Sequence, residues 1–238
     1  MDQDFIKIDF HVHTPVSKCY GAKETTFQQI AETAIQAGLS AIAITDHNTC
    51  EAIAPVREQV QDNGLIVFPG VELSTPQGHV LGLFEADAPI ETIEDLLASV
   101  GIPQDAGGNG TIMTASPIEA VFAGIDQRGG TAIAAHIERW PSGFLETRES
   151  RKVKRQIHNS PYLSALEITQ PQNLELWRTG EMRSYPKKYP CVQGSDAHAL
   201  IDIGRRPTYV KLKDISLRSL REVFHSDSAS IKFPHEMA

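Results

Sequence analysis

Short apolar runs alternate with amphipathic helical patterns from one end of the sequence to the other. The runs read as strands over 5–13, 40–46, 65–72, 79–84, 131–136, 163–169, 191–195 and 207–212. Several are apolar without interruption, which is typical of parallel strands buried on both faces. Because no shift in composition divides the chain, the repeated strand–helix units predict a parallel α/β barrel formed by residues 1–238 as one domain.

Two of the helical patterns carry start and stop signals. In TFQQIAETAIQAG, Thr26 and Gln29 predict a capping box, and Gly38 predicts the end of the helix. In SPIEAVFAGIDQRGG, Ser116 is the predicted N-cap and Glu119 completes the box. Further helices are predicted over 49–63, 90–100, 144–158 and 216–226, and the segment 101–115 reads as a loop.

Composition narrows the classes of function. The net charge of −8 argues against a broad nucleic-acid-binding surface, but it leaves room for a small anionic substrate held by metals. The cysteines Cys19, Cys50 and Cys191 are odd in number and lack C-x-x-C spacing, so no disulfide framework is expected. No apolar run approaches the roughly 20 residues of a membrane helix, and the N-terminus lacks the pattern of a signal peptide. We therefore expect a cytoplasmic protein.

Histidines and acids gather where the predicted strands end. The histidines are His11 and His13 in DFHVHT, His47 in ITDHNT, His136 in AAHIE and His198 in GSDAH. His79 in GHVLGL differs, because it begins its strand. The accompanying acids are Asp9, Asp46, Glu72 and Asp196.

We expect these side chains to meet around metal ions. Asp9, His11 and His13 alternate, so in a strand they share one face. The C-terminal ends of barrel strands build the active site, and carboxylates buried there are costly unless a cation pairs with them. A single histidine at a strand end is more often a structural residue, but the joint pattern over five segments favours metal binding. The mixed imidazole and carboxylate set suits zinc, manganese or iron better than magnesium or calcium alone.

The stretches DFHVHT, ITDHNT, PGVELS, HVLGLF, AAH and GSDAH resemble, in this order, the motifs of the polymerase and histidinol phosphatase family, known as PHP domains. The resemblance extends from about residue 5 to about residue 213. It implies a distorted (β/α)7 barrel, similar to a TIM barrel, with two or three divalent metal ions (Mn, Zn or Fe) at its mouth. It also implies the hydrolysis of phosphoesters.

The resemblance assigns a role to each of these positions. The matching ligands are His11, His13 and Asp196 for a first metal, Glu72 as a bridge, His79 and His136 for a second metal, and His47 and His198 for a third. Asp46 matches a neighbour of the ligands. Asp46 or Asp9 is expected to orient an imidazole from outside the coordination sphere.

The sequence departs from the family after the paired histidines. Many small phosphoesterases of the family have an SDG segment there, whose acid helps to hold the third metal, whereas this chain has SKCY with Lys18 at the acid's position. An ammonium group cannot ligate a metal, so the resemblance leaves the third site open. Lys18 is a candidate for binding substrate phosphate or an exposed surface lysine, and Cys19 is a candidate substitute ligand.

The expected reaction is attack on phosphorus by a metal-bound hydroxide. Where the third metal is absent, His198 or His47 is the candidate that protonates the leaving group. Arg139, Arg205 and Arg206 are candidates for phosphate contacts, with a solvated turn as the alternative interpretation. The basic run at 148–155 reads as an exposed helix face, with attraction of a polyanionic partner as the alternative.

We therefore expect a metal-dependent phosphoesterase that hydrolyses a small phosphorylated metabolite or nucleotide. One alternative is a regulatory PHP module, associated with or fused to a larger ATP-binding (ATPase) or DNA-processing partner, with a structural or vestigial metal site. SKCYGAKE motivates it, because this stretch resembles PHP domains at the front of larger ATP-binding proteins. A nuclease acting on single strands is chemically close to the first reading but is disfavoured by the acidic charge.

Overall fold

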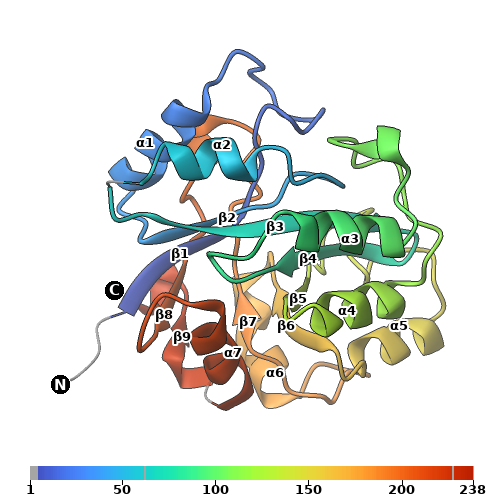
Figure 1. Cartoon of the computed structure of the whole chain (residues 1–238). Coiled ribbons are helices and arrows are strands. Elements are labelled where there is room, and N and C mark those ends of the chain that lie inside the picture. The colour runs from blue at the N-terminus through green and yellow to red at the C-terminus, as the bar shows by residue number, and fades with distance from the viewer. Residues whose placement is uncertain (1–4, 62, 227, 238) are drawn as a thin grey trace.

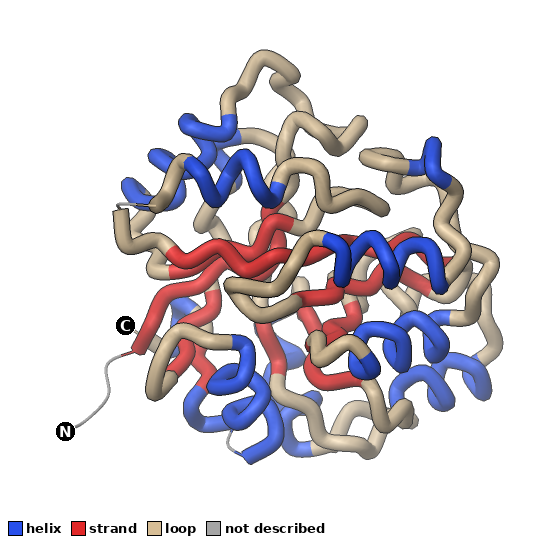
Figure 2. Tube along the Cα trace, in the orientation of Figure 1, coloured by secondary structure: helices blue, strands red, loops and turns tan. Residues whose placement is uncertain are grey.

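The sheet of this protein curls into a nearly closed barrel, with long loops gathered above it (Figures 1 and 2). The computed structural model describes residues 5–61, 63–226 and 228–237. Within them, the strands are hydrogen-bonded in the order β7-β6-β5-β4-β3-β2-β1-β8-β9. The strands are β1 (Phe5–Val12), β2 (Ala41–Ile44), β3 (Ile66–Thr75), β4 (Gly78–Leu83), β5 (Thr131–Ala134), β6 (Leu163–Glu167), β7 (Cys191–Val192), β8 (Thr208–Lys211) and β9 (Ile231–Lys232).

Helices cover the outside of the barrel and close its lower end. They are α1 (Phe27–Gln36), α2 (Ile53–Glu58), α3 (Glu91–Ser99), α4 (Ile118–Gln127), α5 (Arg151–His158), α6 (Leu174–Thr179) and α7 (Leu217–Ser226). Figure 1 shows α7 beside β8 and β9, away from the loops at the opposite end. No helix among the described residues is long and apolar enough to cross a membrane.

Alternation along the strands separates two apolar cores. In β2, Ala41 and Ala43 face the barrel interior, whereas Ile42 and Ile44 face the helices outside. The interior core is completed by side chains of α7, among them Phe224. Because alternate side chains enter the two cores, both faces of the sheet are buried. The polar side chains gather at the upper end of the barrel.

The expectation of a wholly parallel sheet is wrong in two places. β4 is antiparallel to both β3 and β5, and β8 is antiparallel to β1. The cause at β4 is the tight turn after Thr75, where Gly78 adopts a φ of +128°, because a strand that returns through such a turn must reverse direction. The start of β4 therefore lies at the same end of the barrel as the C-terminal ends of the parallel strands.

The barrel closes where the segment after β7 meets β1. Val12 and Ala197 form a parallel bridge, with the His13 amide donating to the Ala197 carbonyl at 3.1 Å. Gly194 allows this close approach, because a Cβ there would lie 2.4 Å from the Cβ of His11. This seam brings the residues after β7 next to the paired histidines of β1.

Most predicted elements are present, but their ends and caps differ in places. Thr26 and Gln29 form the predicted capping box of α1, and Gly38 follows the end of that helix with a φ of +69°. The predicted cap of α4 is wrong: Pro117 is its N-cap, and the Ser116 hydroxyl donates to the Val100 carbonyl. The helices predicted over 49–63 and 144–158 are shorter, as α2 and α5, and α6 and β9 were not predicted.

Candidate metal centre

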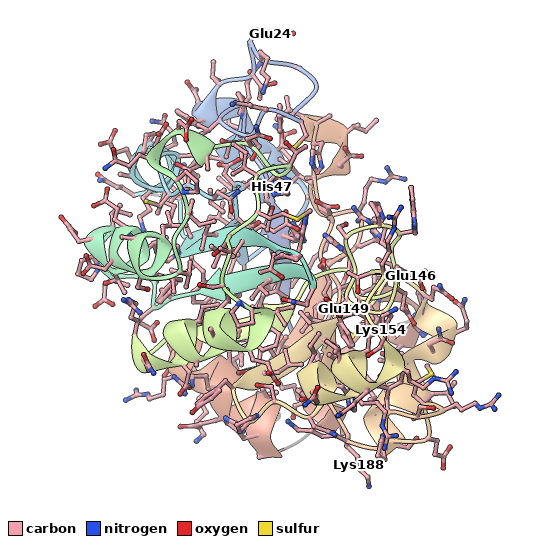
Figure 3. All side chains as sticks on the ribbon, turned by 90° about the vertical axis from the view of Figure 1, so that its right-hand side faces the viewer. Glu24, His47, Glu146, Glu149, Lys154 and Lys188 are labelled. Carbon is pink, nitrogen blue, oxygen red and sulfur yellow. The ribbon has the colours of Figure 1, made fainter. Side chains whose placement is uncertain are left out.

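Six imidazoles and two carboxylates converge at the upper end of the barrel. His11 lies on β1, with His13 just beyond it; Glu72 is on β3 and His79 on β4, while His47, His136, Asp196 and His198 lie in loops after β2, β5 and β7. The reversal of β4 explains why His79 joins the cluster although it begins its strand. Figure 3 shows His47 among the loops above the teal strands. The predicted ligand positions therefore come together in one place.

Glu72 is the centre of the cluster and is fully buried. Its Oε1 lies 2.8 Å from His79 Nδ1 and 2.9 Å from His136 Nε2. Its Oε2 lies 3.0 Å from His47 Nδ1, 3.2 Å from His13 Nε2 and 3.3 Å from His11 Nε2. One carboxylate thus contacts five imidazoles, which come from the ends of β1, β2 and β5 and from the start of β4.

The partners of His11 and His13 fix which ring nitrogen carries the proton. His11 Nδ1 lies 3.1 and 3.2 Å from the two carboxylate oxygens of Glu167, which only accept. The Ser17 hydroxyl donates to Asp46 at 2.5 Å, so its oxygen accepts from His13 Nδ1 at 3.1 Å. In the neutral form of each ring, both Nε2 atoms therefore carry the lone pairs, and these atoms face each other at 3.1 Å.

The donor set fits divalent cations. Two nitrogen lone pairs 3.1 Å apart repel unless a positive charge lies between or beside them. The buried Glu72 Oε2 and His47 Nδ1 atoms have no hydrogen-bond partner among the described residues, although they are only 3.0 Å apart. A buried carboxylate oxygen and an imidazole nitrogen without such partners are costly unless a cation joins them. Imidazole and carboxylate ligands are those that zinc, manganese and iron accept.

Ligand atoms fall into three overlapping groups, each spanning no more than 4.8 Å. The groups are His11, His13, Glu72 and Asp196; His47, Glu72 and His79; and His13, His47 and His198. The first group has the composition expected for the first metal. His47 differs from the expectation, because it is shared between the second and third groups.

The charges in the cluster depend on one another. Burial raises the pKa of Glu72, but the imidazoles of His47, His11 and His79 outweigh it and hold that pKa well below its usual value. Burial lowers the pKa of His11, but Glu167, Asp196 and Glu72 outweigh it and hold that pKa well above its usual value. The carboxylates thus require positive charge at the centre, which protons or metal cations supply.

Two side chains of the cluster sit on unusual backbone. His136 has a φ of 28° and Asp196 a φ of 49°, in the left-handed region that non-glycine residues seldom adopt. Such conformations cost about 1–3 kcal/mol each and persist where the surroundings hold them. The Glu167 carboxylate does so at His136, by accepting its backbone N–H at 2.7 Å.

The predicted substrate-binding residues differ in how near they lie to the cluster. Arg139 reaches it, because its guanidinium pairs with Asp196 while its side chain remains 37% exposed. Arg206 donates to the Ser195 carbonyl, next to Asp196. Arg205 is exposed and pairs with Asp202 at 2.9 Å. The Lys18 side chain is exposed, and its backbone amide donates to Gly108.

Asp46 and Asp9, the two acids expected to orient an imidazole from outside the coordination sphere, have different hydrogen-bond partners. Asp46 contacts Ser17 and Thr14, and so orients His13 through the Ser17 hydroxyl. Asp9 does not join His11 and His13 on one face, because β1 is irregular between Asp9 and Val12. Its carboxylate instead accepts from the amides of Ser195 and Gly204, and thereby holds the loop that carries Asp196.

Sequence reasoning missed Glu167 and the role of the glycine-rich turn. Glu167 is buried at the end of β6, where the only signal is a single acid in the predicted strand LSALEIT. The glycine-rich turn GGNG (107–110), part of the segment 101–115 that reads as a loop, lies against the cluster. A Cβ on Gly110 would lie 2.7 Å from His47 Nε2, so only glycine allows this contact.

A cavity of about 370 Å³ opens beside His79. Its lining includes Thr75, Thr111, Met113, Pro141 and Thr147. It is therefore largely apolar with hydroxyl groups, and it adjoins the metal-ligand cluster.

A family model for the PHP domain matches residues 9–141. The 5′-3′ exoribonuclease Rnm of Escherichia coli (strain K12) is 38% identical over 82 residues, which cover 32% of this chain and 26% of that protein. The phosphoribosyl 1,2-cyclic phosphate 1,2-diphosphodiesterase of Eggerthella lenta is 34% identical over 88 residues, which cover 34% of this chain and 32% of that protein.

Among solved structures, the lesion-specific endonuclease PfuEndoQ from Pyrococcus furiosus is similar, with a TM-score of 0.69 and 17% identity. That similarity covers 96% of this chain and 57% of the endonuclease. The matched regions thus span only part of each of these proteins. Asp196 and His198 lie outside the segment that the family model matches and enter the cluster through the seam after β7.

Proposed function

The chain belongs to the PHP domain family, whose model matches its residues 9–141, and from this premise we propose that it is a metal-dependent phosphoesterase. Its substrate is a nucleotide or another small phosphorylated metabolite. The barrel acts as a single catalytic domain, an assignment supported by the unbroken order of strands from β7 to β9.

The observation that carries this proposal is the orientation of lone pairs in the cluster. His11 and His13 both direct at Glu72 Oε2 the Nε2 atom that carries the lone pair in the neutral tautomers set by Glu167 and Ser17, and that oxygen lacks a hydrogen-bond partner among the described residues. A structural histidine cluster would instead satisfy its polar atoms internally. Divalent cations bound there would neutralise the charge that develops on a phosphoryl group during in-line attack by water.

Arg139 is the candidate residue for binding the substrate phosphate. Its guanidinium lies at the rim, half-exposed, and already pairs with the carboxylate of Asp196. A phosphate has the same kind of oxygens and matches the guanidinium fork in the same way. Arg206 and the exposed Lys18 and Arg205 add positive charge around the rim, in a chain whose net charge is −8.

The cavity beside His79 is the candidate site for the organic part of the substrate. Met113 is 52% exposed at its edge, and Trp140, next to Pro141 of the lining, is 76% exposed. Exposed apolar side chains beside a polar cluster suit a ligand with an apolar or aromatic part and an anionic part. Where the third metal position is empty, His198 is the candidate proton donor to the leaving oxygen, because it lies at the mouth and is 31% exposed.

The proposal is tested with the full chain, stripped of metal and then loaded with Mn²⁺ or Zn²⁺, on a panel of nucleotides and sugar phosphates. We expect metal-dependent release of phosphate, lost in His13→Ala. His225→Ala serves as the matched control, because His225 is an exposed histidine on α7. Equal turnover in the wild-type chain and in His13→Ala would contradict the assignment.

A nuclease acting on single strands is the second candidate, and Trp140 favours it. An exposed tryptophan beside the cluster offers a surface on which a base can stack. Two of the similar proteins are an exoribonuclease and an endonuclease. Cleavage of a short single-stranded oligonucleotide in preference to a mononucleotide, with KM raised in Trp140→Ala, would support this candidate.

The same panel of phosphoesters also tests the alternative that the chain is a regulatory PHP module. A chain that binds its full complement of metal and hydrolyses none of these phosphoesters would favour a regulatory role with an associated ATPase or DNA-processing partner. Turnover by the isolated chain would remove that alternative.

A further inference from the structure

A basic groove runs along the exposed face of α5, outside the metal-ligand cluster. A cavity of about 330 Å³ in this groove is lined by Arg151, Lys152, Arg155, Gln156 and Asn159. All five residues are exposed, and none of these lining residues is acidic. The groove is therefore a concentrated positive patch on a chain whose net charge is −8.

The stability of α5 gives no reason for these three charges. Arg151, Lys152 and Arg155 form no ion pair among the described residues. The first turn of α5 contains no acid, although the N-terminal turn of a helix favours negative charge. Arg151 and Arg155 are also like charges four positions apart, which repel each other on a helix. A negatively charged partner outside the helix does give a reason for them.

The groove lies close to the cavity beside His79. Thr147 lines that cavity, and α5 begins four residues later at Arg151. Because consecutive Cα atoms are about 3.8 Å apart, the Cα atoms of Thr147 and Arg151 are separated by no more than about 15 Å. Pro141 lines the same cavity, next to the exposed Trp140. One extended ligand can therefore reach the metal-ligand cluster, Trp140 and the groove.

Two acids belong to the segment that joins the cavity to the groove. Glu146 is exposed, and the Glu149 carboxylate accepts from the Gln77 side-chain amide at 3.4 Å. Figure 3 shows both acids, with Lys154, below His47. Since these carboxylates repel an anion, a polyanion is expected to make its contacts at the cluster and along α5, and not between them.

We propose that the basic groove of α5 binds the phosphate backbone of a single-stranded nucleic acid whose reacting phosphate lies at the metal-ligand cluster. A chain of phosphates can occupy both places at once, which a mononucleotide cannot. The exposed Trp140 suits the unstacked bases of a single strand, which a duplex does not present. The inference deepens the nuclease candidate and rests on the proposed function for the cleavage, whereas binding in the groove does not require cleavage.

The test measures binding of a fluorescein-labelled RNA of about 12 nucleotides to the full chain in a chelator, by fluorescence anisotropy at several salt concentrations. The double variant Arg151→Gln/Arg155→Gln should bind more weakly. Its slope of log K against log salt should be shallower by about 1.4, because each lost contact with a single strand removes about 0.7. Lys213→Gln/Arg218→Gln is the matched control, since both residues are exposed and lie near α7, and it should keep the wild-type slope.

Two further measurements exclude a merely structural effect. Glu146→Gln should bind the same RNA more tightly than the wild-type chain, because it removes a negative charge beside the path of the strand, whereas the exposed Glu119→Gln on α4 should not. Arg151→Gln/Arg155→Gln should melt at no lower temperature than the wild-type chain, because it removes a like-charge pair from α5. Weaker binding by this variant then cannot come from misfolding.

Three outcomes would overturn the inference: a double variant with the affinity and slope of the wild-type chain, equal affinity for a duplex of the same sequence, or competition by polyglutamate as effective as that by unlabelled RNA. The last would indicate an acidic protein as the partner. The proposed function fails separately. If the groove binds RNA but the metal-loaded chain hydrolyses no phosphoester, only the proposed function is overturned, and if phosphoesters are hydrolysed while RNA binding does not depend on α5, only this inference is.

Discussion

Glu167 determines which ring nitrogen of His11 faces the centre of the cluster. Its carboxylate accepts from His11 Nδ1 and from the backbone amide of His136, so one buried side chain positions two ligand residues. An acid that holds the proton of a ligating imidazole also makes that imidazole a better metal ligand. Glu167 is therefore a positioning residue of the candidate centre.

Glu167→Gln should weaken zinc binding by about 10–100-fold. Glutamine keeps an oxygen acceptor but loses the negative charge that favours the ligating tautomer of His11. Competition with a chromophoric chelator measures the affinity, and Glu119→Gln, on the exposed face of α4, is the matched control. An affinity equal to that of the wild-type chain would show that Glu167 serves packing alone.

The ligands were predictable from sequence and Glu167 was not, for a physical reason. A ligand such as His13 or Asp196 follows a strand, and strand ends meet at one end of a barrel, so position along the chain indicates position in space. Glu167 is one acid in a buried strand without a partner at a fixed spacing. Its role depends on the separation between β6 and β1, which the sequence of neither strand specifies.

At the scale of elements, the contact between α5 and α6 depends on a buried histidine. His158 at the end of α5 is fully buried, and its ring lies 5.8 Å from Trp177 of α6 and 5.1 Å from Tyr189, between ring centroids. Burial lowers the pKa of His158 to about 4. The folded protein therefore keeps this ring neutral at pH values where an unfolded chain protonates it.

The free energy of unfolding should consequently fall in mild acid. The contribution is complete above pH 6.5, where both states are neutral, and is lost as the pH falls from 6.5 toward 4, because the unfolded state alone binds a proton there. At pH 5 the loss is about 2 kcal/mol. Urea denaturation at pH 7 and pH 5 should show a smaller decrease in His158→Phe than in the wild-type chain or in the exposed control His225→Phe. An equal decrease in all three proteins would contradict the assignment.

The helices and strands that the sequence predicted best are the long ones with a regular apolar repeat. The runs that became β1 and β3 and the capped pattern of α1 satisfy local rules over several residues. β9, with two residues, was not predicted, and the strand predicted over 191–195 forms only the two-residue β7. Such short strands depend on the hydrogen bonds that a neighbouring strand offers. The direction of β4 was missed because the turn before it, and not the strand, decides the pairing.

At the scale of the whole molecule, the ligands tie together strands that lie far apart in the sequence. They come from β1, β3 and β4 and from the loops after β2, β5 and β7. An unfolded chain cannot present this set, so a bound cation stabilises the folded barrel by mass action.

Saturating Zn²⁺ should raise the free energy of unfolding by about 4 kcal/mol when the free metal is roughly a thousand times its Kd. Urea denaturation with and without a chelator measures this increment. His13→Ala should lose most of it, because it removes a ligand of the first group, and His225→Ala should keep it. Identical midpoints with and without zinc in the wild-type chain would contradict a metal-clamped barrel.

Glu72 has a consequence for how cations share this centre. Its two oxygens belong to one rigid group: Oε1 contacts His79, of the second group of ligands, whereas Oε2 contacts His11 and His13, of the first group. A cation that draws one oxygen toward itself reorients the other, so occupancy of one position changes affinity at the next, and by thermodynamic reciprocity the reverse also holds. Uptake of successive ions should therefore be cooperative rather than independent, with Glu72 as the mechanical link between them.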